Sequence, residues 1–287
     1  MNSPRPSRQW SQRTAFGLLG LATVVVIVAV SFIIIYIITN GAGAVDWAFL
    51  TQSPTEAGKA GGILPALVGT FLLMLGTVLF SLPIGVSAGI YLAEYAKDNR
   101  LTRIINMAIL NLAGVPSVVY GLFGLGLFVL TFRFGMSLMS ASLTLASQAL
   151  AMVVTTSREA MLAVPRDYRE GSLAIGATKW QTIRHVVLPQ AWSGIITGAI
   201  LAISRAAGET APILVVGAAF LLPGLPQSPF DRFMALPYHL YTVAAHVPGM
   251  PKGTMWGVAL VLLGVVLAFN IAAAIIRSRT SRRRHSS

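Results

Sequence analysis

Long apolar segments alternate with shorter polar segments along the 287-residue chain. An uninterrupted apolar run of about 18 residues is long enough to cross a bilayer as a helix, which satisfies its own backbone where water is absent. The pattern predicts membrane-spanning helices over six segments: 15–39, 63–93, 104–132, 136–157, 190–222 and 254–277. The second and fifth exceed the bilayer thickness, so we expect kinks at Pro83 and Pro212. The predicted fold class is therefore an all-α membrane protein, with residues 1–287 as a single transmembrane domain.

The distribution of positive charge predicts how these helices are oriented. Cytoplasmic segments of membrane proteins carry an excess of Lys and Arg. Sixteen of the 21 basic residues fall on one side of the six predicted spans: Arg5, Arg8, Arg13, Lys97, Arg100, Arg103, Arg158, Arg166, Arg169, Lys179, Arg184, Arg277, Arg279, Arg282, Arg283 and Arg284. The opposite side holds only Lys59, Arg133, Arg232 and Lys252. We therefore expect both termini and the loop 158–189 in the cytoplasm, and we attribute the net charge of +12 to this bias rather than to nucleic-acid binding.

The connections on the opposite side are residues 40–62, a short turn near Arg133 and a Pro-rich stretch over 223–253. Each is either a docking surface or an ordinary solvated loop.

The loop 158–189 contains an ordered series of helix and turn signals. Pro165 and Asp167 are typical of a helix start, and Gly176 permits a tight turn. An apolar face is predicted from Leu173, Ala177, Trp180 and Ile183. These features indicate a surface that a partner protein binds.

The spacing within this loop resembles the EAA loop of ABC importer permeases. Glu170 takes the acidic position, and the remaining positions are filled by Gly171, Ser172, Gly176, Val186, Leu188 and Pro189. Gly171 and Ser172 replace the usual paired alanines, but they preserve small size. The resemblance implies a type I ABC importer permease fold, in which this loop forms coupling helices that sit in a cleft of a separate ATP-binding subunit.

The residues of this chain also indicate that ATP is hydrolysed by a different protein. A phosphate-binding loop requires Gly-Lys-Ser or Gly-Lys-Thr, but the chain's Gly58-Lys59 pair is followed by Ala60. ATP hydrolysis is therefore expected in a different polypeptide, and the resemblance implies that this chain is a transporter subunit and not an enzyme.

Two charged residues, Arg205 and Glu209, interrupt the fifth apolar segment. Charged groups within a span are costly and usually face a bundle interior or an aqueous path. Four residues apart on a helix, they lie on one face and can pair. One interpretation is a structural ion pair, and the other is that Arg205 offers its donors to a passing oxyanion while Glu209 neutralises and positions it.

The segment from Ser204 to Pro212 also resembles phosphate transporter permeases, the PstA family, as does most of the chain. In the third span, the pattern around Pro116, Ser117 and Tyr120 matches this family too. The resemblance implies substrate-path candidates Arg205, Glu209, Thr210, Ser117 and Tyr120, although Gly121 and Gly124 are typical of close helix packing.

Other apparent motifs carry less weight. Gly85-Val-Ser87-Ala-Gly89 fits a hydrolase pattern, but it lies in an apolar span where glycines permit helix packing. His185, His239, His246 and His285 lack metal-ligand spacing, and cysteine is absent, so we expect no metal and no cofactor. The basic run Arg282 to Arg284 is interpreted as an anchor to anionic membrane lipid.

The sequence thus predicts a multi-pass permease of the bacterial inner membrane that moves inorganic phosphate by alternating access. The resemblance implies a second homologous permease, two copies of an ATP-binding subunit and a periplasmic phosphate-binding protein as partners. A permease for molybdate, sulfate or phosphonate is the nearest alternative. A membrane-embedded enzyme and a passive channel are more distant alternatives.

Overall fold

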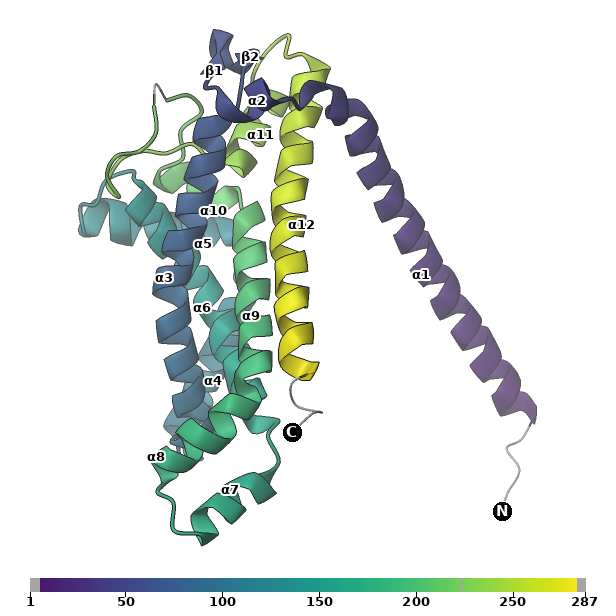
Figure 1. Cartoon of the computed structure of the whole chain (residues 1–287), viewed down its shortest axis with the longest axis vertical. Helices are drawn as coiled ribbons and strands as arrows, with labels where there is room; N and C mark the ends of the chain where they lie inside the picture. The colour runs from purple at the N-terminus through teal and green to yellow at the C-terminus, as the bar shows by residue number, and fades with distance from the viewer. Residues whose placement is uncertain (1–5, 223, 283–287) are drawn as a thin grey trace.

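The computed structural model describes residues 6–222 and 224–282, and this part of the chain is almost wholly helical (Figure 1). The longer helices are α1 Pro6–Gly41, α3 Leu64–Glu94, α4 Arg100–Ala113, α6 Leu138–Leu162, α9 Leu188–Gly208 and α12 Lys252–Arg282. The shorter helices are α2 Trp47–Thr51, α5 Ser117–Gly124, α7 Arg166–Ala174, α8 Lys179–Thr182, α10 Ala211–Val216 and α11 Leu236–Ala245. Strands β1 Pro54–Thr55 and β2 Ala60–Gly61 pair antiparallel at one end of the bundle.

The centre of the bundle is made by α3, α6 and α9, and α12 packs beside α9 (Figure 1). Close approach between α3 and α6 depends on glycine. A Cβ atom added at Gly85 would lie 2.7 Å from Val153 Cγ1, and one at Gly89 would lie 2.6 Å from Ser157 Cβ. The glycines of the apparent hydrolase motif therefore serve helix packing, as the sequence analysis expected, and Ser87 between them is exposed on the helix surface.

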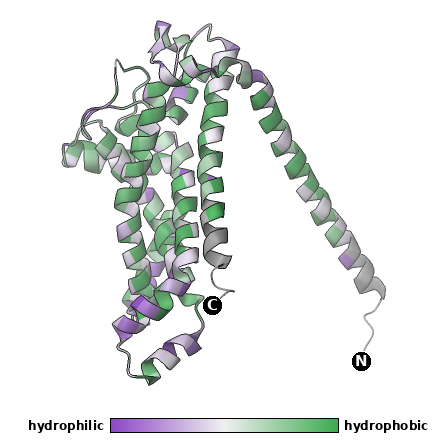
Figure 2. Ribbon diagram, viewed as in Figure 1, coloured by the Kyte–Doolittle hydropathy of each residue, from purple (hydrophilic) through white to green (hydrophobic). Residues whose placement is uncertain are grey.

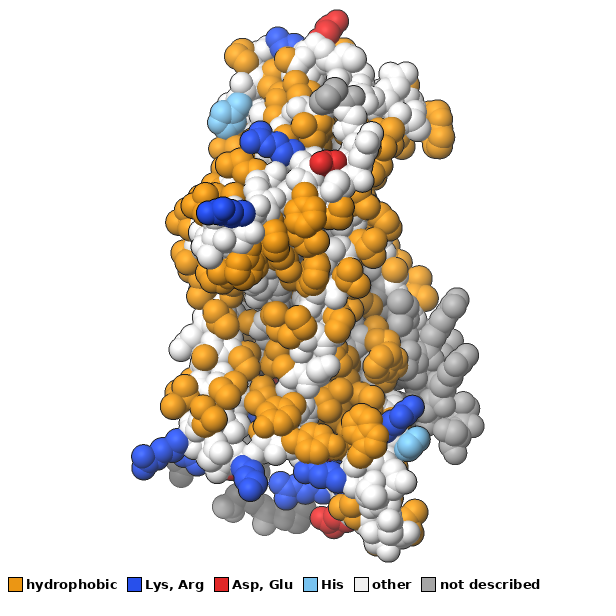
Figure 3. Space-filling model, turned by 90° about the vertical axis from the view of Figure 1, so that its left-hand side faces the viewer, with side chains coloured by type: hydrophobic (Ala, Val, Ile, Leu, Met, Phe, Trp, Pro, Cys, Tyr) orange, Lys and Arg blue, Asp and Glu red, His pale blue; other side chains and the backbone are white. Residues whose placement is uncertain are grey.

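Five helical segments among the described residues are long and apolar enough to cross a membrane, and the bent pair of α4 and α5 makes a sixth if it forms one span. Their apolar residues dominate the helices of the bundle in Figure 2. Figure 3 shows a broad hydrophobic surface along the molecule and a concentration of Lys and Arg at the end that carries α7 and α8. This distribution agrees with the charge bias in the sequence. The basic run Arg282 to Arg284, which was predicted to anchor to lipid, has its side chains outside the described residues.

The helix expected over 104–132 is present but interrupted. The segment divides into α4 and α5, which are bent by 105° at the break, and α5 continues into a π-helical stretch, Leu125–Thr131. Pro116 lies in the break, where it supplies no backbone N–H and disfavours a helical conformation for Val115. The sequence contained this signal, but the length of the apolar run concealed it.

The fifth segment also differs from the single helix predicted over 190–222. Helical structure begins earlier, at α8, passes through a π-helical stretch at Ile183–Val187 and continues as α9 to Gly208. Glu209 then adopts extended backbone angles, with φ −72° and ψ 125°, before α10 begins. Pro212 therefore stands in the first turn of a new helix, where its missing N–H is not needed, while α3 runs through Pro83 without a break.

The Pro-rich stretch 223–253 is only partly a solvated loop: residues 224–232 are mostly exposed, but the residues that follow them are not. Phe233, Met234, Ala235 and Leu236 are all fully buried between the helices. The backbone N–H of Leu236 donates to Thr70 Oγ1 at 2.8 Å, which ties the start of α11 to α3. This segment of the connection is thus part of the core at one end of the bundle.

Candidate substrate site and coupling surface

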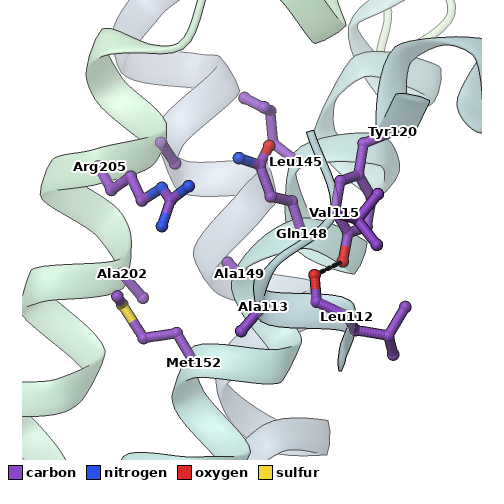
Figure 4. Close-up of a pocket in the computed structure, with 11 residues that line it drawn as sticks. Leu112, Ala113, Val115, Tyr120, Leu145, Gln148, Ala149, Met152, Ala202 and Arg205 are labelled. Carbon is purple, nitrogen blue, oxygen red and sulfur yellow. Dashed lines mark hydrogen bonds between the residues drawn. The ribbon is translucent and has the colours of Figure 1, made fainter. Parts of the chain in front are cut away.

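A small cavity lies beside the points where the third and fifth apolar segments break. Its volume is about 40 Å³, and α4, α5, α6 and α9 contribute to its wall (Figure 4). Most of the lining is apolar, but Tyr120, Gln148 and Arg205 add polar groups. Discontinuous helices commonly surround the binding sites of transporters, because the break exposes polar groups within an apolar bundle. The cavity is therefore the candidate substrate site.

Arg205 reaches from α9 towards Gln148 on α6 in Figure 4. Its Nε lies 3.4 Å from Glu209 Oε1, and the arginine side chain is 54% exposed while that of Glu209 is 16% exposed. The two terminal amino groups of Arg205, Nη1 and Nη2, donate no hydrogen bond to Glu209 or to Gln148 in the described part of the chain. The predicted ion pair is thus present, and most of the guanidinium's donors remain available for an anion.

Gln148 joins the pair from a different helix. Its Nε2 donates to Glu209 Oε1 at 2.7 Å, so Glu209 is held by α6 as well as by Arg205. The sequence analysis missed Gln148. The available signal was its position as the amide side chain within the apolar segment 136–157.

Tyr120 has a clear structural role at the other side of the cavity. Its hydroxyl donates to the carbonyl oxygen of Leu112 at 2.9 Å, which satisfies an acceptor at the end of α4 (Figure 4). Next to it, a Cβ atom on Gly121 would lie 3.0 Å from Pro212 Cα. Gly121 therefore allows α5 to pack closely against α10, which is the packing role expected for the glycines of this segment.

Ser117 and Thr210 are the remaining candidates, and neither lines the cavity. Ser117 is the first residue of α5, and Thr210 immediately precedes α10. Both lie at the helix breaks. The structure therefore brings Arg205, Glu209 and Tyr120 to one region and places Ser117 and Thr210 at its margin.

The predicted EAA loop folds as a helix, a turn and a second helix. Glu170, Gly171 and Ser172 lie on α7, and Gly176 makes the turn with φ +88°, a conformation that suits glycine. Thr178 caps α8 in a capping box with Gln181, and Ser172 Oγ lies 3.0 Å from Thr182 Oγ1. Val186 and Leu188-Pro189 carry the chain from the π-helical stretch into α9.

The outer face of this hairpin is apolar. Leu173, Ile175 and Trp180 are exposed, with 87% of the Ile175 surface accessible. Ile183, which was predicted on the same face, is instead buried in the cluster with Met161 and Val187. Exposed apolar side chains at the tip of a polar loop are typical of a protein-binding surface.

An ion pair that the sequence analysis did not predict attaches α7 to the bundle. Arg169 Nη2 lies 2.7 Å from Glu94 Oε1 at the end of α3, and the two side chains are 19% and 8% exposed. Arg169 also donates to the carbonyl oxygen of Met161, near the end of α6, and to that of Val164, just beyond it. The pairing spans 75 positions in the sequence, so residue spacing offered no signal for it.

These features are matched by a known family. Residues 85–282 fit the family described as binding-protein-dependent transport system inner membrane component. This chain belongs to that family and is therefore a membrane permease subunit of an ABC importer.

Several sequence relatives of this chain are named as phosphate transport permeases. The chain is 34% identical to the phosphate transport system permease protein PstA of Haemophilus influenzae, over 88% of this chain and 90% of that one. It is 38% identical to PstA 1 of Mycobacterium tuberculosis, over 78% and 73% of the two chains. It is also 33% identical to the probable ABC transporter permease YqgI of Bacillus subtilis, over 93% and 95%.

Among solved structures, a bacterial ABC transporter involved in alginate import matches with a TM-score of 0.66 at 12% identity, covering 95% of this chain and 99% of that one. The MetNI methionine transporter matches with a TM-score of 0.62 at 20% identity, covering 76% and 97%. These likenesses confirm the predicted permease fold.

Proposed function

We propose that this subunit carries inorganic phosphate across the bacterial inner membrane by alternating access. The observation that carries the proposal is Arg205, whose guanidinium keeps free donors beside a cavity at two helix breaks. A planar fork of donors suits a tetrahedral oxyanion, and the surrounding apolar side chains strengthen its electrostatic attraction. The identity to phosphate permeases over most of the chain supports phosphate over molybdate, sulfate or phosphonate.

The hairpin of α7 and α8 is the proposed contact for a separate ATP-binding subunit. Its exposed Leu173, Ile175 and Trp180 supply apolar surface for that contact, and Glu170 lies exposed on α7 beside them. Because Arg169 joins α7 to Glu94 and to the end of α6, a movement of the hairpin reaches the central helices directly. Two such ATP-binding subunits, one for each permease, would drive the alternation.

A second, homologous permease is the proposed partner within the membrane. The most apolar window of α1 has none of its residues buried, and α1 meets α12 only near its C-terminal end while the rest of it diverges from the bundle (Figure 1). Half of the Arg205 side chain is likewise uncovered. A partner permease would cover α1 and close the cavity from its open side, and a periplasmic phosphate-binding protein would deliver phosphate at the end of the bundle that carries β1 and β2.

The test is ATP-dependent uptake of radiolabelled phosphate into vesicles that contain the reconstituted complex. Arg205→Ala removes the free donors and is expected to lower uptake by at least about 100-fold, since a charge-assisted hydrogen bond contributes about 1.5–3 kcal/mol and the donors act together. Arg103→Ala is the matched control, because that arginine forms an exposed pair with Asp98. Normal uptake by an assembled Arg205→Ala complex would overturn the proposed role of the arginine.

A further inference from the structure

The two oxygens of the Glu209 carboxylate have different surroundings. Oε1 accepts hydrogen bonds from Gln148 Nε2 at 2.7 Å and from Arg205 Nε at 3.4 Å. Oε2 accepts none of the hydrogen bonds that these two neighbours donate. A carboxylate beside an anion site would normally oppose binding, because two negative groups repel in an apolar surrounding. Oε2 is therefore available to a ligand that brings a proton.

Resting on the proposed function, we propose that Glu209 selects for a protonated oxyanion and that Gln148 positions it for this task. Phosphate keeps at least one P–OH group at neutral pH, whereas sulfate keeps no proton. Arg205 donates to the unprotonated oxygens of the bound anion, and Glu209 Oε2 accepts from its P–OH. An anion without a proton places an oxygen against the carboxylate and leaves that acceptor unpaired.

The state of Gln148 supports a positioning role. Its Oε1 is buried and has no hydrogen-bond partner in the described part of the chain. Turning the amide over would place Oε1 against the Glu209 carboxylate oxygen and lose the bond from Nε2, so the hydrogen bond to Glu209 favours the observed orientation. An unpaired buried acceptor is unfavourable, and a charge-assisted bond from the same amide offsets that cost.

A site of this kind is expected to discriminate strongly between a protonated and an unprotonated anion. A site built around a buried hydrogen bond rejects an analogue that cannot form it much more strongly than an apolar pocket rejects a change in size. The positive and negative charges of Arg205 and Glu209 nearly cancel, so a second negative charge on the anion brings little added attraction. The proton on the anion is then the feature that distinguishes the two substrates.

The experiment measures competition for radiolabelled phosphate bound to the purified complex of permeases and ATP-binding subunits, without the periplasmic binding protein. Three competitors are used: arsenate, which is protonated at neutral pH, and sulfate and monofluorophosphate, which are not. In the wild type, arsenate is expected to compete like phosphate, and both unprotonated anions to compete at least about 100-fold less well. Monofluorophosphate is close to phosphate in size, so it separates protonation from shape.

Glu209→Gln supplies an amide that can either donate or accept. The preference for protonated over unprotonated anions is therefore expected to fall at least tenfold in this variant, whereas Glu209→Asp retains part of that preference. Gln148→Met, of similar length but without a donor, is expected to weaken the preference while the complex still assembles. Strong competition by sulfate in the wild type, or an unchanged preference in both Glu209→Gln and Gln148→Met, would overturn the inference. Failure of the wild type to bind phosphate would instead overturn the proposed function.

Discussion

At the scale of single residues, charge and polarity inside the apolar segments marked the site. Arg205 and Glu209 were conspicuous in the sequence and do pair in the structure. Gln148 was less conspicuous because an amide is a smaller departure from an apolar run, and its role depends on a partner 61 positions away. Residue types along one chain do not show which side chains meet across such a separation, so the third member of the cluster became visible only in the fold.

His239 provides a prediction at the same scale. It is buried on α11, outside the candidate spans, with its ring stacked on Phe220 at 5.4 Å between centroids. Burial lowers the pKa of His239 to about 4 from its ordinary value near 6.5. The unfolded chain therefore takes up a proton between these values while the folded chain does not, and stability falls as pH drops through this window.

Between pH 7 and pH 5 this residue is expected to cost about 2 kcal/mol of stability, measured by thermal unfolding across the pH range. His239→Phe keeps a ring in place and removes the titration, so its stability should decline less over that interval. His246→Phe is the control, because His246 is exposed. Equal pH dependence in the wild type and His239→Phe would contradict the assignment.

At the scale of elements, apolar length predicted where spans occur but not whether they are continuous. The Gly114-Val-Pro116 sequence lies within an apolar run, and only its bend of 105° shows that it divides two helices. The fifth segment is similar, since Gly208 and Pro212 frame the break at Glu209. In both cases the local signal was correct, and the longer-range pattern outweighed it.

The hairpin of α7 and α8 was predicted more completely, because its helix start, its Gly176 turn and most of its exposed apolar residues are local features. What holds it to the bundle was not local. Arg169 on α7 pairs with Glu94 on α3, so the attachment depends on how the helices pack.

The attachment leads to a prediction for coupling. Arg169→Ala leaves a largely buried Glu94 unpaired, which typically costs about 3–5 kcal/mol locally, and frees α7 from α3 and α6. In the reconstituted complex, ATP hydrolysis should continue while phosphate uptake falls at least about tenfold. The ratio of the two rates is the measurement, with Arg103→Ala as the surface control. Uptake and hydrolysis that fall in proportion would indicate loss of assembly rather than of coupling.

At the scale of the whole molecule, the charge bias predicts that α7 and α8 face the cytoplasm and α2 faces outward. The chain has no cysteine, so single cysteines report sidedness without background. Thr51→Cys on α2 and Gln181→Cys on α8 are both at exposed positions. A membrane-impermeant maleimide added to intact cells with a permeabilised outer membrane should label Thr51→Cys and spare Gln181→Cys. The reverse labelling would invert the topology.

The central claim is that this permease serves phosphate import, and ATP-dependent uptake by the wild-type complex tests it most directly. Vesicles containing the permease, its partner permease, the ATP-binding subunits and the binding protein are supplied with radiolabelled phosphate, sulfate or molybdate. The account predicts that phosphate accumulates only when ATP is present and that neither other anion accumulates. Uptake of sulfate or molybdate in place of phosphate would contradict the substrate assignment and leave the permease family alone established.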